Sequence, residues 1–160
     1  MSESIRLAIT SDVDRIEPLW RDLYAAQRTQ GMRVEIPHEG FALWARSYAG
    51  TLARFSVIVV AESDAEIIGF VAGRLRTPPA WFGGLNVGFI SEVYVAPERR
   101  GQGIAAQMLT ISAAWFRNIG VHRLELHVLR ANSRARETYE SLGWTNELCQ
   151  MVLELGDQNR

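Results

Sequence analysis

A glycine-rich stretch in the middle of the chain has the residue types that hold phosphate groups. Residues 96–105 read Ala-Pro-Glu-Arg-Arg-Gly-Gln-Gly-Ile-Ala, and an apolar pattern of helical spacing starts at the second glycine. Glycines allow close approach to the backbone, and the first turn of a helix carries N–H groups without intrahelical acceptors. Arg99 and Arg100 add full positive charges beside this turn. The stretch therefore predicts a loop that binds an anion such as a pyrophosphate.

Two other interpretations of this stretch stay open. Gly101, Gly103 and Ala106 spell the GxGxxA pattern of dinucleotide-binding folds, and Glu125 stands nineteen residues after Ala106. Against a dinucleotide site, residues 96–100 separate the first glycine from the preceding strand, and the motif stands late in the chain. The remaining interpretation is a structural glycine-rich turn that binds nothing.

The arginines around this stretch give it a local positive charge. The 160 residues include 17 basic and 18 acidic side chains, a net charge of −1, and no lysine. Between Val95 and Arg136, seven arginines stand against two glutamates, a charge of +5, and the rest of the chain carries −6. The net charge argues against a nucleic-acid partner, whereas the basic block favours one small polyanionic ligand. These arginines could instead be solvated ends of helices and loops.

The composition excludes several classes of site. Without lysine, the chain cannot form a P-loop, a kinase active site or a pyridoxal Schiff base. A single cysteine, Cys149, excludes a disulfide framework and is expected in the core. His122 and His127 lie an odd number of positions apart on one expected strand, so they cannot share a metal, and we expect no metal. Neither a signal peptide nor a membrane-spanning run is found, so we expect a cytoplasmic protein without a membrane partner.

Hydrophobic periodicity predicts one mixed α/β domain over residues 1–160. The first helix should start near Ser11 and be kinked or restarted by Pro18, and the second should run from about Phe41 to Gly50. Later helices are expected at 103–116 and 132–142, the last capped by Asn132. The element order is β-α-α-β-β-β-α-β-α-β, and the expected strands are 5–9, 55–62, 67–76, 87–95, 123–129 and 148–155. In the strand 87–95, a period of two places Ile90, Glu92 and Tyr94 on one face.

At these residues the sequence resembles the GCN5-related N-acetyltransferases, the GNAT family. Arg100, Gly103 and Ala105 are similar to the family's Arg/Gln-x-x-Gly-x-Gly/Ala signature, and residues 92–97 resemble its fourth strand. A second conserved block of the family is similar to Asn132, Ala135, Tyr139, Gly143 and Trp144. The resemblance covers about residues 5–155. It implies a central, mostly antiparallel sheet flanked by helices, with the fourth and fifth strands splayed.

The resemblance also implies acetyl-CoA as the acyl donor. The pyrophosphate would lie on the backbone N–H groups of residues 100–105, and the pantetheine arm would pair with the backbone of Val93 and Val95. Tyr139 lies two helical turns from Asn132 on the same face, and it would protonate the departing thiolate. The implied cofactor-binding residues are Val93, Tyr94, Val95, Arg99, Arg100, Gly101, Gln102, Gly103, Ile104, Ala105, Asn132, Arg136 and Tyr139.

Acetylation of an amine needs a base as well. An amine with a pKa of about 10.4 must lose a proton at neutral pH before it attacks a thioester. Glu92 is the expected base, because its apolar neighbours would raise the pKa of its carboxyl group toward neutrality. The alternatives are a structural carboxylate paired with an arginine, His127 as the base, and ordered water alone.

The acceptor site is implied only in outline. In the family, the acceptor enters beside the first two helices and the loop before the fourth strand, which gives as candidates Tyr24, Arg28, Met32, Trp81 and Phe82. These aromatic rings could equally be core, and Trp81 with Phe82 could form a lid or the contact of a homodimer. Three carboxylates could attract a cationic amine: Asp22, Glu35 and Glu39.

The sequence therefore predicts an enzyme that moves an acetyl group from acetyl-CoA to a primary amine by direct attack on the thioester. The acceptor would be a small molecule or a peptide such as a protein N-terminus. The alternative is a catalytically silent domain that binds or senses acyl-CoA.

Overall fold

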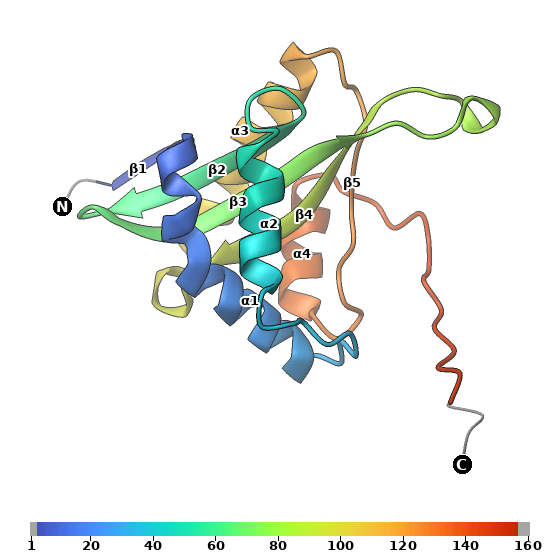
Figure 1. The fold of residues 1–160 in the computed structure, drawn as a ribbon, viewed down its shortest axis with the longest axis horizontal. Coiled ribbons are helices and arrows are strands. Elements are labelled where there is room, and N and C mark those ends of the chain that lie inside the picture. Colours follow the sequence, from blue (N-terminus) through green and yellow to red (C-terminus); the bar gives the residue numbers. More distant parts are fainter. Residues whose placement is uncertain (1–2, 157–160) are drawn as a thin grey trace.

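A five-stranded sheet forms the centre of the protein (Figure 1). The computed structural model describes residues 3–156, so residues 1–2 and 157–160 of the expected domain lie outside the described residues. β4 and β5 are parallel, and the other neighbouring strands are antiparallel. The predicted mixed, mostly antiparallel sheet is confirmed. Across the sheet lie β1 (Glu3–Leu7), β2 (Ser56–Ser63), β3 (Glu66–Arg76), β4 (Val87–Val95) and β5 (Leu124–Leu126).

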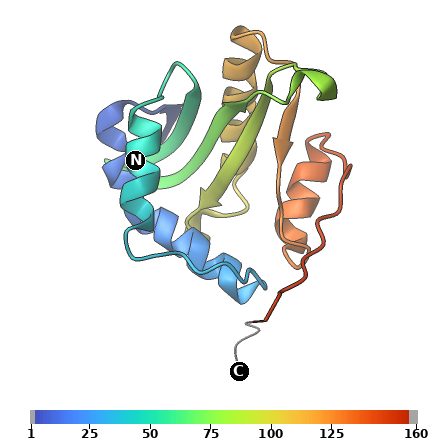
Figure 2. The same ribbon diagram turned by 45° about the vertical axis from the view of Figure 1, so that its right-hand side comes forward.

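Helices cover both faces of this sheet (Figure 2). α1 (Glu17–Thr29) and α2 (Gly40–Ala49) lie on one face, and α3 (Ile104–Asn118) lies on the other. α4 (Ser133–Ser141) lies beside β5. Pro18 stands in the first turn of α1, where its missing N–H would have no acceptor, so it restarts the helix rather than kinking it. Short 3-10 turns occur at Thr10–Asp12, Asp14–Ile16, Ala80–Phe82 and Pro97–Arg99.

Alternate side chains of the central strands pack on opposite faces. Ile58, Val60 and Phe70 belong to the core beneath α1 and α2. Val59 and Val71 belong to the core beneath α3. Because both faces are covered, the middle of β2 is an unbroken apolar run rather than an alternating one.

β4 contains one extra residue relative to β3. Glu92 pairs with Ala72, and the ladder resumes at Ile90 after Ser91, which has no partner in β3. Such a bulge reverses the face that the following side chains occupy. Ile90 therefore packs on the α3 face, whereas Tyr94 packs on the face of α1 and α2. The prediction that Ile90 shares a face with Glu92 and Tyr94 is wrong, because simple alternation does not register an inserted residue.

The last predicted strand, residues 148–155, does not form. Residues 145–156 are irregular, and Cys149, expected in the core, is exposed. β5 is also shorter than the predicted strand 123–129 and offers little edge for pairing. An alternating sequence specifies an apolar face but not a partner strand. Here the apolar side chains are between 83% and 91% exposed at Leu148, Met151, Leu153 and Leu155.

A buried carboxylate ties the start of the chain to the sheet. Asp12 is 2% exposed and accepts hydrogen bonds from Arg6 at 2.7 and 3.0 Å, from Arg15 at 2.8 Å and from the N–H of Ile9 at 2.9 Å. Both arginines also pair with Glu62 of β2, at 2.8 and 2.9 Å. The hydrogen bond from Arg6 is the main reason that the pKa of Asp12 falls to about 2. The network therefore fixes the segment that leads from β1 into α1.

Asp12→Asn should lower the free energy of unfolding by about 2 kcal/mol at pH 7. The folded-state pKa of Asp12 is lowered from 3.8 to about 2, so its contribution is complete above about pH 4 and is lost as the pH falls through 2. Urea unfolding of both proteins between pH 2 and 7 measures this, and the difference should shrink in acid. As a control, Glu17→Gln breaks the exposed Glu17–Arg21 pair and should cost no more than about 0.5 kcal/mol. Equal losses in the two variants would contradict the role of Asp12.

Candidate active site

The predicted anion-binding loop presents a run of free backbone N–H groups. It connects β4 to α3, and Gly101 and Gly103 have left-handed φ angles of +78° and +76°. The N–H groups of residues 101–106 have no hydrogen-bond acceptor within residues 3–156. The next N–H group, that of Gln107, bonds to the carbonyl oxygen of Gly103 at 3.1 Å. The loop thus offers consecutive donors and the positive end of a helix dipole to an anion.

Open space lies in front of this loop. A Cβ atom at Gly103 would meet no other atom within 4 Å, and one at Gly101 would lie 3.9 Å from Nη2 of Arg134. Arg134 belongs to α4, so it reaches the loop from a distant part of the sequence. Arg134 belongs to the basic block between Val95 and Arg136, in which Arg136 is the predicted ligand-binding residue. Arg136 donates to a backbone oxygen in the turn before α4, at 3.4 Å, and its contact with a ligand stays a prediction.

Arg99 and Arg100 both hold the loop in place. Nη2 of Arg99 pairs with Glu3 of β1 at 3.0 Å, and its Nε is buried without an acceptor in the described part of the chain. Nε of Arg100 donates to the carbonyl oxygen of Val95 at 2.9 Å, and its guanidinium lies 5.3 Å from the centre of the Tyr94 ring. Their contact with a ligand stays a prediction.

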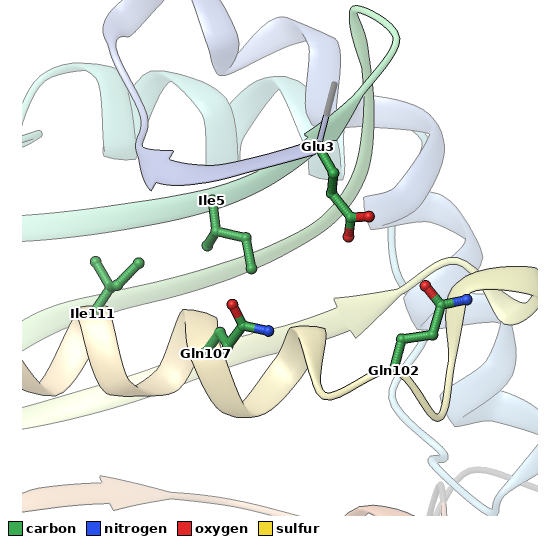
Figure 3. Close-up of a pocket in the computed structure, with 5 residues that line it drawn as sticks. All are labelled: Glu3, Ile5, Gln102, Gln107 and Ile111. Carbon is green, nitrogen blue, oxygen red and sulfur yellow. The ribbon is translucent and has the colours of Figure 1, made fainter. Parts of the chain in front are cut away.

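Gln102 faces a hollow on the β1 side of α3, with a volume of about 460 Å³ (Figure 3). Glu3 and Ile5 come from β1, and Gln107 and Ile111 come from α3. β1 and β5 are opposite edges of the sheet. The hollow is therefore separate from the region where β4 and β5 diverge.

β4 and β5 separate after three paired residues, as the predicted splay requires. Residues 88–90 lie opposite residues 124–126, and within the described chain no strand continues this ladder along the rest of β4. The N–H group of Ala96 points toward β3, where it finds its acceptor. By alternation along the strand, the N–H and C=O groups of Val93 and Val95 point the opposite way. Backbone donors and acceptors therefore line the opening between the two strands.

Asn132 and Tyr139 occupy the two ends of α4. The Oδ1 atom of Asn132 accepts the N–H three residues further on at 3.2 Å, which confirms the predicted cap. Tyr139 is half-buried against the core beneath α3, with its ring 6.0 Å from that of Trp144. Burial raises the pKa of Tyr139 to about 12, so its phenol keeps its proton at neutral pH. A group in this state can act as a proton donor.

Glu92 is buried on the face of β4 that α1 and α2 cover. Its exposed fraction is 4%, its Oε1 accepts a hydrogen bond from the hydroxyl of Tyr24 at 2.8 Å, and its Oε2 accepts one from Ser91. The hydroxyl oxygens of Ser91 and Tyr48 are 2.7 Å apart. Burial raises the pKa of Glu92, and the hydrogen bonds from Ser91 and Tyr24 oppose that rise. The carboxyl group therefore has the raised pKa expected of the base, but with aromatic neighbours rather than Ile90.

Among the expected acceptor residues, Tyr24 is the one that contacts Glu92. Arg28 is exposed near the end of α1, and Met32 is half-buried just beyond it. Trp81 and Phe82 lie at the tip of the long connection between β3 and β4 (Figure 1). Their exposed fractions are 89% and 79%, so neither side chain is packed over Glu92, and their contact with an acceptor stays a prediction.

His127 is the alternative candidate for the base. His127 is exposed, and its ring lies 5.0 Å from that of Phe89. Across residues 3–156, no group of three or more His, Cys, Asp or Glu side chains could hold a metal ion. No helix of the described chain is long and apolar enough to cross a membrane.

Comparison with known proteins agrees with this geometry. The sequence model of the Acetyltransferase (GNAT) family matches residues 16–144. An uncharacterized N-acetyltransferase of Archaeoglobus fulgidus is 42% identical over an alignment of 89 residues, and the match covers 52% of this chain and 56% of that protein's length. The chain thus spans little more than half of this relative.

Two solved structures share the fold. A predicted acetyltransferase of Clostridium acetobutylicum with acetyl-CoA has a TM-score of 0.77 and 21% identity, covering 99% of this chain and 100% of its own. AAC(6')-Iy, in complex with the bisubstrate analogue CoA-S-monomethyl-acetylneamine, has a TM-score of 0.77 and 18% identity, covering 98% of this chain and 99% of its own. The family match runs from the start of α1 to the turn after α4, and the chain therefore belongs to the GNAT acetyltransferase family.

Proposed function

We propose that the protein transfers an acetyl group from acetyl-CoA to a primary amine. The observation that carries this proposal is the organisation of β4. Within residues 3–156, no strand pairs with its second half on the β5 side, the loop after it presents six N–H groups without acceptors, and Glu92 lies buried on one of its faces. An acyl-CoA with a pyrophosphate and an extended arm, together with an amine that must be deprotonated, needs all three features.

The loop suits the phosphate part of acetyl-CoA. The N–H groups of residues 101–106 would bind pyrophosphate oxygens, Gly103 leaves the space open, and Arg134 adds a positive charge. The backbone of Val93 and Val95 would bind the amides of the pantetheine arm. Acetyl-CoA supplies the thioester, and the N–H of Val93 would polarise its carbonyl group.

Glu92 and Tyr139 divide the proton transfers. Glu92 takes a proton from the ammonium form of the acceptor, which leaves a nitrogen lone pair for attack on the carbonyl carbon. As the C–N bond forms and the C–S bond breaks, Tyr139 donates its proton to the departing sulfur. The second proton of the amine then neutralises the phenolate, directly or through solvent.

The acceptor belongs to the primary amines, either a small molecule or a peptide. The amine-based bisubstrate analogue bound by AAC(6')-Iy supports this class. A cytoplasmic location and a homodimer through Trp81 and Phe82 form part of the proposal and rest on the sequence alone.

Ligand binding and thiol release together test this function. A ligand at 100 times its Kd stabilises a protein by about 2.7 kcal/mol, so acetyl-CoA and CoA should raise the melting temperature and NAD should not. Thiol release from acetyl-CoA should depend on an added amine from a panel of polyamines, aminoglycosides, amino acids and peptides. Stabilisation by CoA without release for any amine would support the silent binding domain, and stabilisation by NAD alone would support a dinucleotide site.

Gly103→Ala should weaken acetyl-CoA binding by about tenfold or more, because its methyl group would enter the space in front of the loop. Gly120→Ala is the matched control. Gly120 follows the other end of α3, has a φ of +83°, and has no atom within 4 Å of a Cβ. Both variants should lose about 1 kcal/mol of stability from the left-handed backbone, and calorimetric titration should detect weaker binding in Gly103→Ala alone. Equal affinity in the two variants would contradict a ligand on this loop.

Glu92→Gln should lower kcat by about 10²- to 10⁴-fold at neutral pH and recover activity in alkali, where the amine deprotonates without help. In the wild type, the rate should rise with pH as the carboxyl group, with its raised pKa, ionises. Tyr139→Phe keeps the ring, so it should lower kcat without removing this rise. A rate profile between pH 5 and 10 separates the two variants, and a wild-type profile in Glu92→Gln would exclude Glu92 as the base.

A further inference from the structure

Both carboxylate oxygens of Glu92 are already occupied by hydroxyl groups. Ser91 donates to Oε2, and its own hydroxyl is engaged with Tyr48 and with the carbonyl oxygen of Ala72 at 3.3 Å. Oε1 accepts from Tyr24. With Glu92 only 4% exposed, an amine nitrogen cannot contact the carboxylate directly in this arrangement.

Tyr24 is the one hydroxyl around Glu92 with capacity left for a substrate. Its oxygen makes a single hydrogen bond within residues 3–156, as the donor to Glu92, so its lone pairs can accept an N–H. Tyr24 is half-buried and keeps some exposure to solvent, whereas Tyr48 is fully buried. Its ring is held by Trp20, 4.5 Å away between ring centres, on the same side of α1. A proton from outside can therefore reach Glu92 through Tyr24.

We propose that Tyr24 is a further catalytic residue, which accepts a proton from the amine while it passes its own proton to Glu92. This inference rests on the proposed acetyl transfer. The N–H bond of the ammonium breaks as an O–H bond forms on Tyr24, and the original O–H bond of Tyr24 breaks as one forms on Oε1 of Glu92. Tyr24 is neutral before and after, Glu92 changes from carboxylate to acid, and the amine gains its lone pair.

The surroundings of Glu92 favour a coupled transfer. The titratable and charged groups that act on it are Tyr24 from α1, Tyr48 from α2 and Arg74 from β3. Burial and the charge of Glu92 raise the pKa of Tyr24, so a free phenolate would be unfavourable and the two proton movements must occur together. Arg74 lies over the ring of Tyr48, 4.4 Å from its centre, so it is engaged with Tyr48 rather than with the hydroxyl of Tyr24. Tyr24 and Glu92 thus form the working pair.

The test compares Tyr24→Phe with Tyr48→Phe, each alone and combined with Glu92→Gln. Tyr24→Phe should lower kcat by about 10²-fold or more at neutral pH, with the KM for acetyl-CoA unchanged. In the Glu92→Gln background, Tyr24→Phe should lower kcat by less than about a further threefold, because both substitutions interrupt the same proton-transfer route. In the Tyr48→Phe background, Glu92→Gln should still lower kcat as it does in the wild type.

A second measurement does not depend on turnover. In carbon NMR titrations of the Glu92 carboxyl group, Tyr24→Phe should raise its pKa, because the charged form loses a hydrogen bond. An unchanged titration, or wild-type kcat and pH profile in Tyr24→Phe, would overturn the relay while acetyl transfer stands. Absence of transfer by the wild type to every amine in the panel would overturn the proposed function, and the relay with it.

Discussion

The extra residue in β4 is the constraint on which the candidate site depends. If β4 alternated without interruption, Glu92 would follow Ile90 onto the α3 face, and the backbone of Val93 would point toward β3. The bulge at Ser91 reverses the face on which the Glu92 side chain lies and the edge toward which the Val93 backbone points. It turns the carboxylate toward α1 and α2, and it turns the polar backbone groups of the second half of β4 toward β5. One inserted residue thus places the proposed base on a face of the strand and hydrogen-bonding groups along its edge.

Two buried carboxylates in this protein show how partners decide what a buried charge does. Asp12 and Glu92 are 2% and 4% exposed. Two guanidinium groups pair with Asp12, which lowers its pKa and makes it a structural anchor. Glu92 accepts hydrogen bonds from the neutral hydroxyl groups of Ser91 and Tyr24, which oppose the effect of burial without overcoming it, so its pKa rises. The same desolvation gives one permanently charged group and one that can exchange a proton.

The parts of the fold that local patterns determine could be predicted from the sequence. The limits of β4, the restart at Pro18 and the cap at Asn132 follow from periodicity, proline geometry and side-chain capping. Other features depend on contacts between distant segments. The bulge at Ser91 is set by pairing with β3, the approach of Arg134 to the loop by the placement of α4, and the missing strand near the C-terminus by the lack of a partner edge.

The proposed division between Glu92 as base and Tyr139 as acid follows from one physical effect acting on two kinds of group. Burial disfavours the charged form of each, so it raises the pKa of both Glu92 and Tyr139. For a carboxyl group, a raised pKa gives the anion more affinity for a proton near neutral pH. For a phenol, it keeps the proton bound at neutral pH, so Tyr139 still holds the proton that the proposed mechanism gives to the departing sulfur. Glu92 faces α1 and α2, whereas Tyr139 packs with the core beneath α3, so the proposed mechanism takes a proton from the amine on one side of the thioester and gives a proton to the sulfur on the other.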